Sequence, residues 1–210
     1  MISIDTFFPR VMPYLIGCSE PIARQAILDS ATRLCEKTLI LRQALDSFNT
    51  IKGLVDYDLE SPNNQMRVAR VLSVTIDGKE IKGLFEEDAP TLSDSKGKPT
   101  CFYTSRIDSE FVLKLHPTPD AKYKVVTTVA LAPTKSATSV EDDLFNVWSD
   151  PVVTGAIAQL AKVPNMPFTN FDLGMLKDRE LAKLTNELRI ESYYGRVRGG
   201  SRVKQRPLVR

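Results

Sequence analysis

The sequence predicts an α+β fold, in which helices from the two ends of the chain form a bundle and an antiparallel β-module is inserted between them. Apolar residues recur at helical spacing in residues 19–38 and again in residues 139–194. Between about Leu39 and Pro133 they alternate instead, which is typical of strands. We therefore divide the chain into an N-terminal helical part (1–38), a β-module (39–133), a C-terminal helical part (134–194) and a basic tail (195–210).

The first long helix is predicted to begin after Ser19, which can act as its N-cap. Pro21 follows in the first turn, where its missing N–H has no helical partner. Small residues on the predicted buried face allow a second helix to approach closely. This face consists of Ala23, Ala26, Ile27, Ala31, Leu34 and Cys35.

Strand signals fill the middle of the chain. Asp77-Gly78 predicts a tight hairpin turn, because both positions tolerate positive φ. Residues 86–100 are polar and rich in Pro, Gly and Ser, which predicts a surface loop. The predicted strands are "VDYDL" (55–59), "MRVARVLSVTI" (66–76), "KEIKGL" (79–84), "CFYTS" (101–105), "EFVLKLH" (110–116) and "KYKVVTTVALA" (122–132).

Three helices are predicted after the β-module. Ser139 and Asp142 have the spacing of a capping box, which would open a short helix. Asp150-Pro151 begins a second helix, and the two prolines of "VPNMPF" end it. The predicted buried stripe of this second helix is Val153, Ala156, Ile157, Leu160 and Ala161. A third helix runs from about Asn170 to Tyr194 and is expected to direct inward Leu173, Leu176, Leu181, Leu184 and Leu188.

Charge separates the basic tail from the rest of the chain. The whole chain has a net charge of +2, and six of its 28 Lys and Arg residues lie in the tail, which has no acid. Residues 1–194 therefore carry 22 basic against 26 acidic residues, a net charge of about −4. A protein that coats nucleic acid more often spreads its cations over a folded face.

Composition argues against a secreted, membrane or metal-binding protein. Cys18, Cys35 and Cys101 are too few and too scattered for a disulfide framework or a zinc site, and we expect them reduced in a cytoplasm. The first residues lack the basic and apolar regions of a signal peptide. No apolar run approaches the about 20 residues of a membrane span, so we expect a soluble protein that does not bind membranes.

The residues needed for catalysis are scarce, so the sequence predicts neither an enzyme nor a cofactor. His116 is the one histidine, and its place beside Pro117 at a turn favours a structural role. The clusters Glu86-Glu87-Asp88 and Glu141-Asp142-Asp143 could be imagined to hold Mg²⁺, but a polar loop and a helix start are ordinary places for acids. No nucleophile elbow, Walker loop or dinucleotide fingerprint is present.

The basic tail is the predicted binding site. Its composition is typical of segments that are disordered alone and become ordered on a partner. A solubilising tail is one alternative, and nucleic-acid binding is another, although no aromatic residue follows Tyr194 for stacking on bases. The residues expected to bind are Arg196, Arg198, Arg202, Val203, Lys204, Arg206, Leu208 and Arg210.

Several strings, taken in order, carry a resemblance that covers nearly the whole chain. They are "FFPRVMPYLIGCSEPIARQAILDSATRLCEKT", "VDYDLE" followed by "VARVLSVTIDGKEI", "FVLKLHPTPDAKYKVVTTVALAPTKSAT", "DDLFNVWSDPVVTGAIAQLAKVPNMPF" and "GSRVKQRPLV". In this order they resemble the head–tail adaptor proteins of tailed phages, akin to the tail tubular protein A family of short-tailed phages.

The resemblance implies a structural virion protein without catalytic residues. Adaptors of this kind form a ring, here expected to have about twelve copies. The implied partners are other copies of the chain, the portal protein and the tail nozzle or tail tube protein. Genomic DNA would pass through the lumen without sequence-specific binding. The implied location is the virion neck or tail, after assembly in the host cytoplasm. Two other hypotheses stay open, a nucleic-acid-binding protein that uses the basic tail and a cell-wall hydrolase centred on His116 or on the carboxylate clusters.

Overall fold

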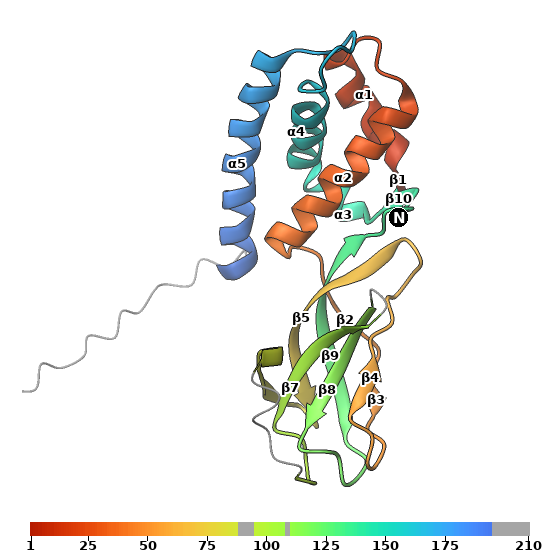
Figure 1. Cartoon of the computed structure of the whole chain (residues 1–210), viewed down its shortest axis with the longest axis vertical. Helices are drawn as coiled ribbons and strands as arrows, with labels where there is room; N and C mark the ends of the chain where they lie inside the picture. Colours follow the sequence, from red (N-terminus) through yellow and green to blue (C-terminus); the bar gives the residue numbers. More distant parts are fainter. Residues whose placement is uncertain (88–94, 108–109, 195–210) are drawn as a thin grey trace, which may run out of the picture.

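The computed structural model describes residues 1–87, 95–107 and 110–194, and in these residues the fold is mixed α+β. Helices gather at one end of an elongated molecule and most strands at the other (Figure 1). The helices are α1 (Phe8–Val11), α2 (Glu20–Thr38), α3 (Asp142–Asn146), α4 (Ser149–Leu160) and α5 (Phe171–Tyr194), with 3-10 turns at Ile4–Phe7 and Met12–Tyr14.

The described strands form a curled eight-stranded sheet and a separate two-stranded sheet. The two-stranded sheet pairs β1 (Ile2–Ser3) with β10 (Ser139–Val140). In the larger sheet the strand order is β2-β9-β5-β6-β7-β8-β4, and β3 pairs with β9 beside β2. The strands of this larger sheet are β2 (Arg42–Ala44), β3 (Phe48–Asn49), β4 (Asp56–Asp58), β5 (Met66–Ile76), β6 (Lys79–Gly83), β7 (Cys101–Ile107), β8 (Glu110–His116) and β9 (Lys124–Pro133).

One strand pair departs from the predicted antiparallel module. Strands β6 and β7 pair in parallel, with Lys82 opposite Cys101 and Gly83 opposite Phe102. A tight hairpin between them would have made the pair antiparallel, but β6 ends at Gly83 and β7 begins at Cys101, a separation in sequence that is long enough for a parallel connection. The predicted turn at Asp77-Gly78 is confirmed, with φ of 51° and 80° between antiparallel β5 and β6.

Helix α2 forms as predicted, except at its cap. All six residues of the predicted face are buried, and the helix packs on α4 and on β9. Ser19 occupies the N-cap position, but its side chain makes no capping hydrogen bond. An N-cap oxygen accepts from the N–H of the second or third helical residue. The second residue here is Pro21, which has no N–H to donate.

The predicted capping box at Ser139 is wrong. Ser139 lies in β10, opposite Ser3 of β1, and Glu141 is the N-cap residue of α3 without a side-chain hydrogen bond. The backbone of Ser139 is extended because it pairs with β1, and helix α3 therefore begins only at Asp142. The short helix itself is confirmed, and its Leu144 is fully buried.

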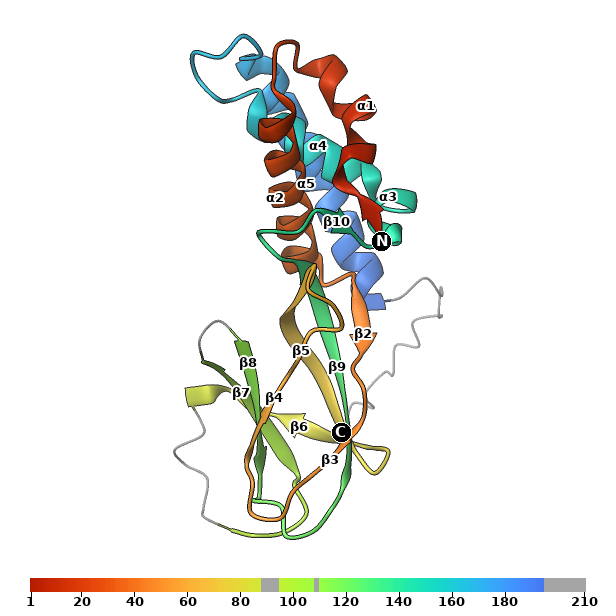
Figure 2. The same ribbon diagram turned by 90° about the vertical axis from the view of Figure 1, so that its right-hand side faces the viewer.

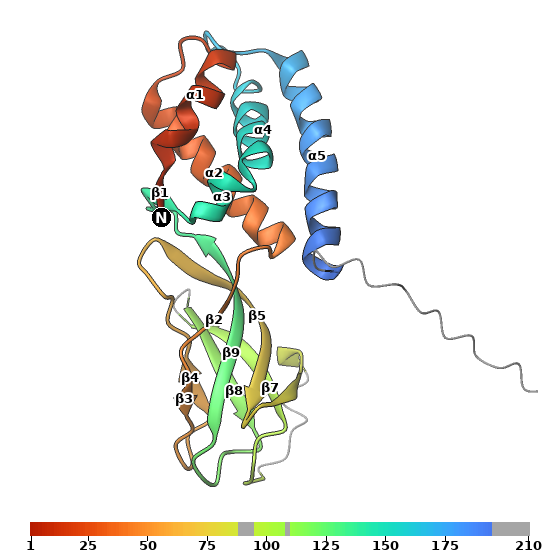
Figure 3. The ribbon, with the colours of Figure 1, turned by 180° about the vertical axis from the view of Figure 1, so that it is seen from behind.

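Helix α4 is buried on nearly every side rather than along one stripe. It lies between α2 and α5 (Figures 1 and 3). Its predicted stripe is buried, and so are further residues, namely Val152, Thr154, Gly155 and Ala158. The close approach of α2 to α4 occurs at Gly155, where an added Cβ would overlap Ser30 Oγ. Ser30 Oγ in turn donates to the carbonyl of Val152 at 2.8 Å.

We expect Gly155→Ala to destabilise the protein by about 1–3 kcal/mol, because the new methyl group overpacks the contact between α2 and α4. Urea denaturation would measure the change. The double variant Ser30→Ala/Gly155→Ala removes the hydroxyl that the methyl group meets, so it should be more stable than Gly155→Ala alone. Equal stability of these two variants would contradict this reading of the contact.

Helix α5 differs from the prediction at Leu176. Leu173, Leu181, Leu184 and Leu188 are half-buried, whereas Leu176 is 60 % exposed. The buried residue at this level of the helix is Gly174, where a Cβ would lie 2.6 Å from Cγ of Lys162. Close contact at Gly174 sets the rotation of α5 and turns Leu176 outward. Helix α5 therefore covers α4 and α2 with one side only.

Candidate interaction surfaces

The predicted binding residues of the basic tail lie outside the described residues. These are Arg196, Arg198, Arg202, Val203, Lys204, Arg206, Leu208 and Arg210. The last described residue is Tyr194, at the end of α5, so the tail begins where α5 ends. The described residues nevertheless contain three surfaces that bear on binding: a basic groove, an apolar side of α5 and an acidic slot.

Two of the residues considered for catalysis, His116 and Asp142, make structural contacts. The backbone carbonyl of His116 accepts from the N–H of Thr100 at 2.9 Å, which holds the end of β8 against the start of β7. Its imidazole makes no hydrogen bond or ion pair within the described part of the chain. Asp142 pairs with the amino group of Met1 at 2.7 Å. Within residues 1–87, 95–107 and 110–194, no group of three acids, cysteines or histidines could hold a metal ion.

The three cysteines are free thiols. Burial raises the pKa of the Cys35 thiol to about 12, and it also raises the pKa of Cys18 and of Cys101. A thiol with a raised pKa stays protonated at neutral pH, and the protonated form is a poor nucleophile.

We expect Cys35 to resist alkylation at pH 8 in the folded protein and to react once the protein is unfolded in urea. Two effects act in the same direction, since the side chain has no exposed surface and its pKa lies above the pH of the assay. Mass spectrometry after iodoacetamide treatment would locate the modified residue. Rapid alkylation of Cys35 under native conditions would contradict this expectation.

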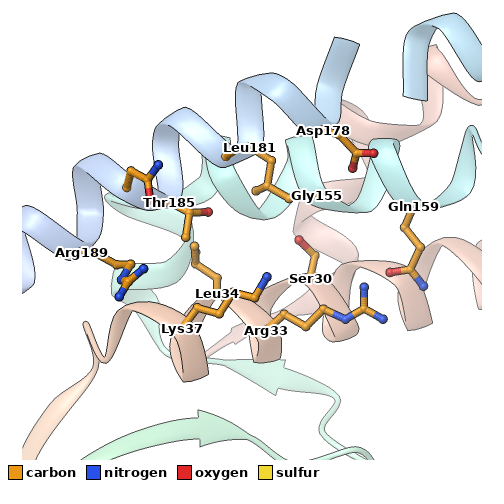
Figure 4. A pocket seen from close by; sticks show the side chains of 12 residues that line it. Ser30, Arg33, Leu34, Lys37, Gly155, Gln159, Asp178, Leu181, Thr185 and Arg189 are labelled. Atoms are coloured by element: carbon orange, nitrogen blue, oxygen red, sulfur yellow. The ribbon is translucent and has the colours of Figure 1, made fainter. Parts of the chain in front are cut away.

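A basic groove runs between α2, α4 and α5 (Figure 4). Its volume is about 680 Å³, and it is lined by the cationic residues Arg33, Lys37 and Arg189. These three make no ion pair with any described residue. Asp178 is the one acid among the lining residues, and Lys162 neutralises it at 2.6 Å. The groove therefore has a positive potential and favours an anionic partner.

The apolar side of α5 is the second surface. Five large apolar residues of this helix are at least half exposed: Phe171, Met175, Leu176, Ile190 and Tyr193. Helix α5 packs against α4 and α2 (Figures 1 and 3), and the five side chains form one group near each end of the helix, with exposed charged residues such as Arg179 and Lys183 between them. Single exposed apolar residues are ordinary, but a set on one helix is typical of an interaction surface.

The acidic slot lies in the β-region, between β4 on one side and β2 with β3 on the other. Its volume is about 750 Å³. The charged residues that line it are Asp46, Asp56, Asp58 and Glu60, and no Lys or Arg lines it. Aromatic rings form part of its wall, since Phe48 of β3 and Tyr57 of β4 have ring centroids 5.1 Å apart. Figure 2 looks onto this face of the molecule.

Sequence reasoning missed the groove and the slot. A signal for the slot exists in "VDYDLE", where Asp56, Asp58 and Glu60 alternate with the buried residues Tyr57 and Leu59. Alternation in β4 places Asp56 and Asp58 on one face, and Glu60 follows two residues after the strand ends. The basic groove has no comparable signal, because its residues come from three helices that are distant in sequence.

Comparison with known proteins places the chain in no family. No protein-family model matches it, and the search of curated proteins gives no significant match. Among the described helices, none combines the length and the apolar character that crossing a membrane requires.

Proposed function

We propose that the chain is a structural head-to-tail adaptor of a tailed phage. In this proposal about twelve copies form a ring between the portal and the tail nozzle or tail tube. Genomic DNA passes through the lumen without sequence-specific binding, and the ring resides in the neck of the virion after assembly in the host cytoplasm. The helices of each copy act as a bundle, and the basic tail binds the portal or a neighbouring subunit. No step of this function is catalytic.

The observation that carries the proposal is the apolar side of α5. The chain has an elongated shape, and its longest helix covers α4 and α2 along one side only (Figure 1). Met175 and Leu176 are 54 % and 60 % exposed. Apolar area gains about 25 cal/mol per Å² when it leaves water, so a second copy against this helix would be stabilised. Elongated subunits that pack side by side through such a helix can close into a ring.

The charge distribution supports a channel through which DNA slides. Residues 1–194 carry a net charge of about −4, so the body of the protein repels DNA overall. Six cations lie in the tail and three line the basic groove.

The proposal is tested by the size of the purified protein with and without the portal protein encoded in the same genome. Light scattering should give a complex that contains about twelve copies of the 23.5 kDa chain once the portal ring is added. A chain that remains a monomer with the portal present would overturn the proposal.

A nucleic-acid-binding protein is the second candidate function, and the basic groove favours it. Arg33, Lys37 and Arg189 form no ion pair with a described residue, and they line a groove beside α5, the helix that precedes the basic tail. In this case the free protein should bind duplex DNA with a salt dependence of log K of about −5 from the tail alone. The variant Arg196→Ala/Arg198→Ala/Arg202→Ala/Arg206→Ala should lose most of this binding. Absence of DNA binding at low salt would remove this candidate.

A further inference from the structure

We propose that the acidic slot binds the basic tail of a second copy of the chain, which adds a strand between β4 and the edge formed by β2 and β3. This inference rests on the self-association in the proposed function. It deepens that function by assigning the tail to a neighbouring subunit.

Two unpaired strand edges line the slot. Strands β2 and β3 pair with β9, and β4 pairs with β8. Within the described residues, no backbone hydrogen bond joins β2 or β3 to β4. Each edge therefore offers free N–H and C=O groups to an extended segment, except near Ile51 and Leu54, whose backbone N–H and C=O, respectively, bond Tyr57 Oη at 3.0 Å. Recognition of a segment by an open sheet edge is a recurrent mode of protein binding.

The charges of slot and tail are complementary. Asp46, Asp58 and Glu60 form no ion pair with any described residue, while Asp56 faces Lys114 at 3.4 Å. The tail carries six cations and no acid in its 16 residues. Carboxylates that already line one slot attract such a segment and help to fix its position.

The residue patterns of slot and tail also match. Strand β4 reads Asp56-Tyr57-Asp58, with both acids exposed and the tyrosine buried. The tail reads Arg202-Val203-Lys204. In extended form its two cations point to one side and the valine to the other. A tail strand beside β4 can thus set its cations against the acids and its valine against the aromatic wall.

One buried hydroxyl beside the slot has no partner among the described residues, which is compatible with an occupant of the slot. Thr127 lines the slot and is 1 % exposed. Its Oγ1 is one of two buried side-chain oxygen or nitrogen atoms without a hydrogen-bond partner among the described residues. Buried polar atoms are rarely left unpaired, and a strand in the slot would bring donors to this oxygen.

The geometry favours the tail of another copy over the chain's own tail. Helix α5 and strands β3 and β4 lie on opposite sides of the molecule (Figures 1 and 3). The chain's own tail would have to pass around the sheet before it entered the slot, which would use much of its maximum span of about 55 Å. The basic groove beside α5 also repels a tail that folds back on its own subunit. A subunit placed next to α5 presents its slot without this detour.

Disulfide cross-linking between two differently substituted full-length chains tests the inference. One chain carries Gln43→Cys in the slot, and the other carries Gln205→Cys in the tail, so no charge is altered. At low salt under mild oxidant, we expect the linked dimer to form at least tenfold faster than with Gln25→Cys, an exposed position on α2. Mass spectrometry of the linked peptides identifies the pair. Adding Asp58→Asn/Glu60→Gln to the slot chain should abolish the difference.

A rate no greater than that of the Gln25→Cys control would overturn the inference. A link that forms only inside one chain carrying both cysteines would overturn it as well. The result is separate from the test of the proposed function, because cross-linking reports the contact whether or not a ring forms. If a ring forms but the cross-link does not, the slot is not the binding site of the tail. If the cross-link forms but no ring does, the adaptor function is rejected and the contact between tail and slot is kept.

Discussion

Replacing Phe7 with alanine is expected to lower the free energy of unfolding by about 3–5 kcal/mol, the range for a fully buried aromatic residue. Phe7 has no exposed surface, and its ring meets that of Phe145 edge-to-face with centroids 5.1 Å apart. The contact joins the first turns of the chain to α3, which follows the whole β-region in sequence. The loss would be a large part of the about 5–15 kcal/mol that stabilises a typical domain.

Urea denaturation followed by the fluorescence of Trp148, the one tryptophan, measures this effect. Phe171→Ala is the matched control, because Phe171 is 56 % exposed and its truncation should change stability by no more than about 0.5 kcal/mol. Similar losses in the two variants would show that the segment before α2 is not part of the core.

If the proposed ring forms, the double variant Met175→Glu/Leu176→Glu is expected to abolish it, with little effect on the stability of the single chain. Both side chains are exposed, so the charged residues stay in water in the monomer. In a packed assembly they would have to be buried without a partner, which is strongly unfavourable. Light scattering in the presence of the portal protein should then give no ring complex.

The exchange Met175→Leu/Leu176→Met is the control, because it keeps the apolar character and the approximate volume of both side chains. It should assemble as the wild type does. A Glu/Glu variant that still assembles would remove the apolar side of α5 from the interface between copies.

The sequence was sufficient where structure depends on local pattern. The six apolar residues of the predicted α2 face recur at helical spacing, and all of them are buried. Asp77 and Gly78 tolerate positive φ, and the hairpin turn forms there. In both cases, the preference of the residues themselves decides the structure.

Elsewhere, contacts between distant segments override local signals. The spacing of Ser139 and Asp142 suggested a capping box, but pairing with β1 places Ser139 in a strand. The spacing of leucines in α5 suggested that Leu176 is buried, but close packing at Gly174 rotates it outward. A periodic pattern indicates that a helix has an apolar side, and the partner helix decides which residues on its border are covered.

For the acidic slot, too, one part can be predicted from the sequence and another part cannot. The alternation around Asp56 and Asp58 makes one face of β4 acidic and can be read from the sequence. The position of β2 and β3 across the slot depends on the curl of the whole sheet, which sequence periodicity does not encode.

The proposed adaptor function would be tested most directly by an image reconstruction of the neck of tailed-phage particles from a genome that carries the gene for this chain. We predict a closed ring of this protein between portal and tail, with α5 of each copy packed against the next copy. Particles whose neck lacks the protein would contradict the account.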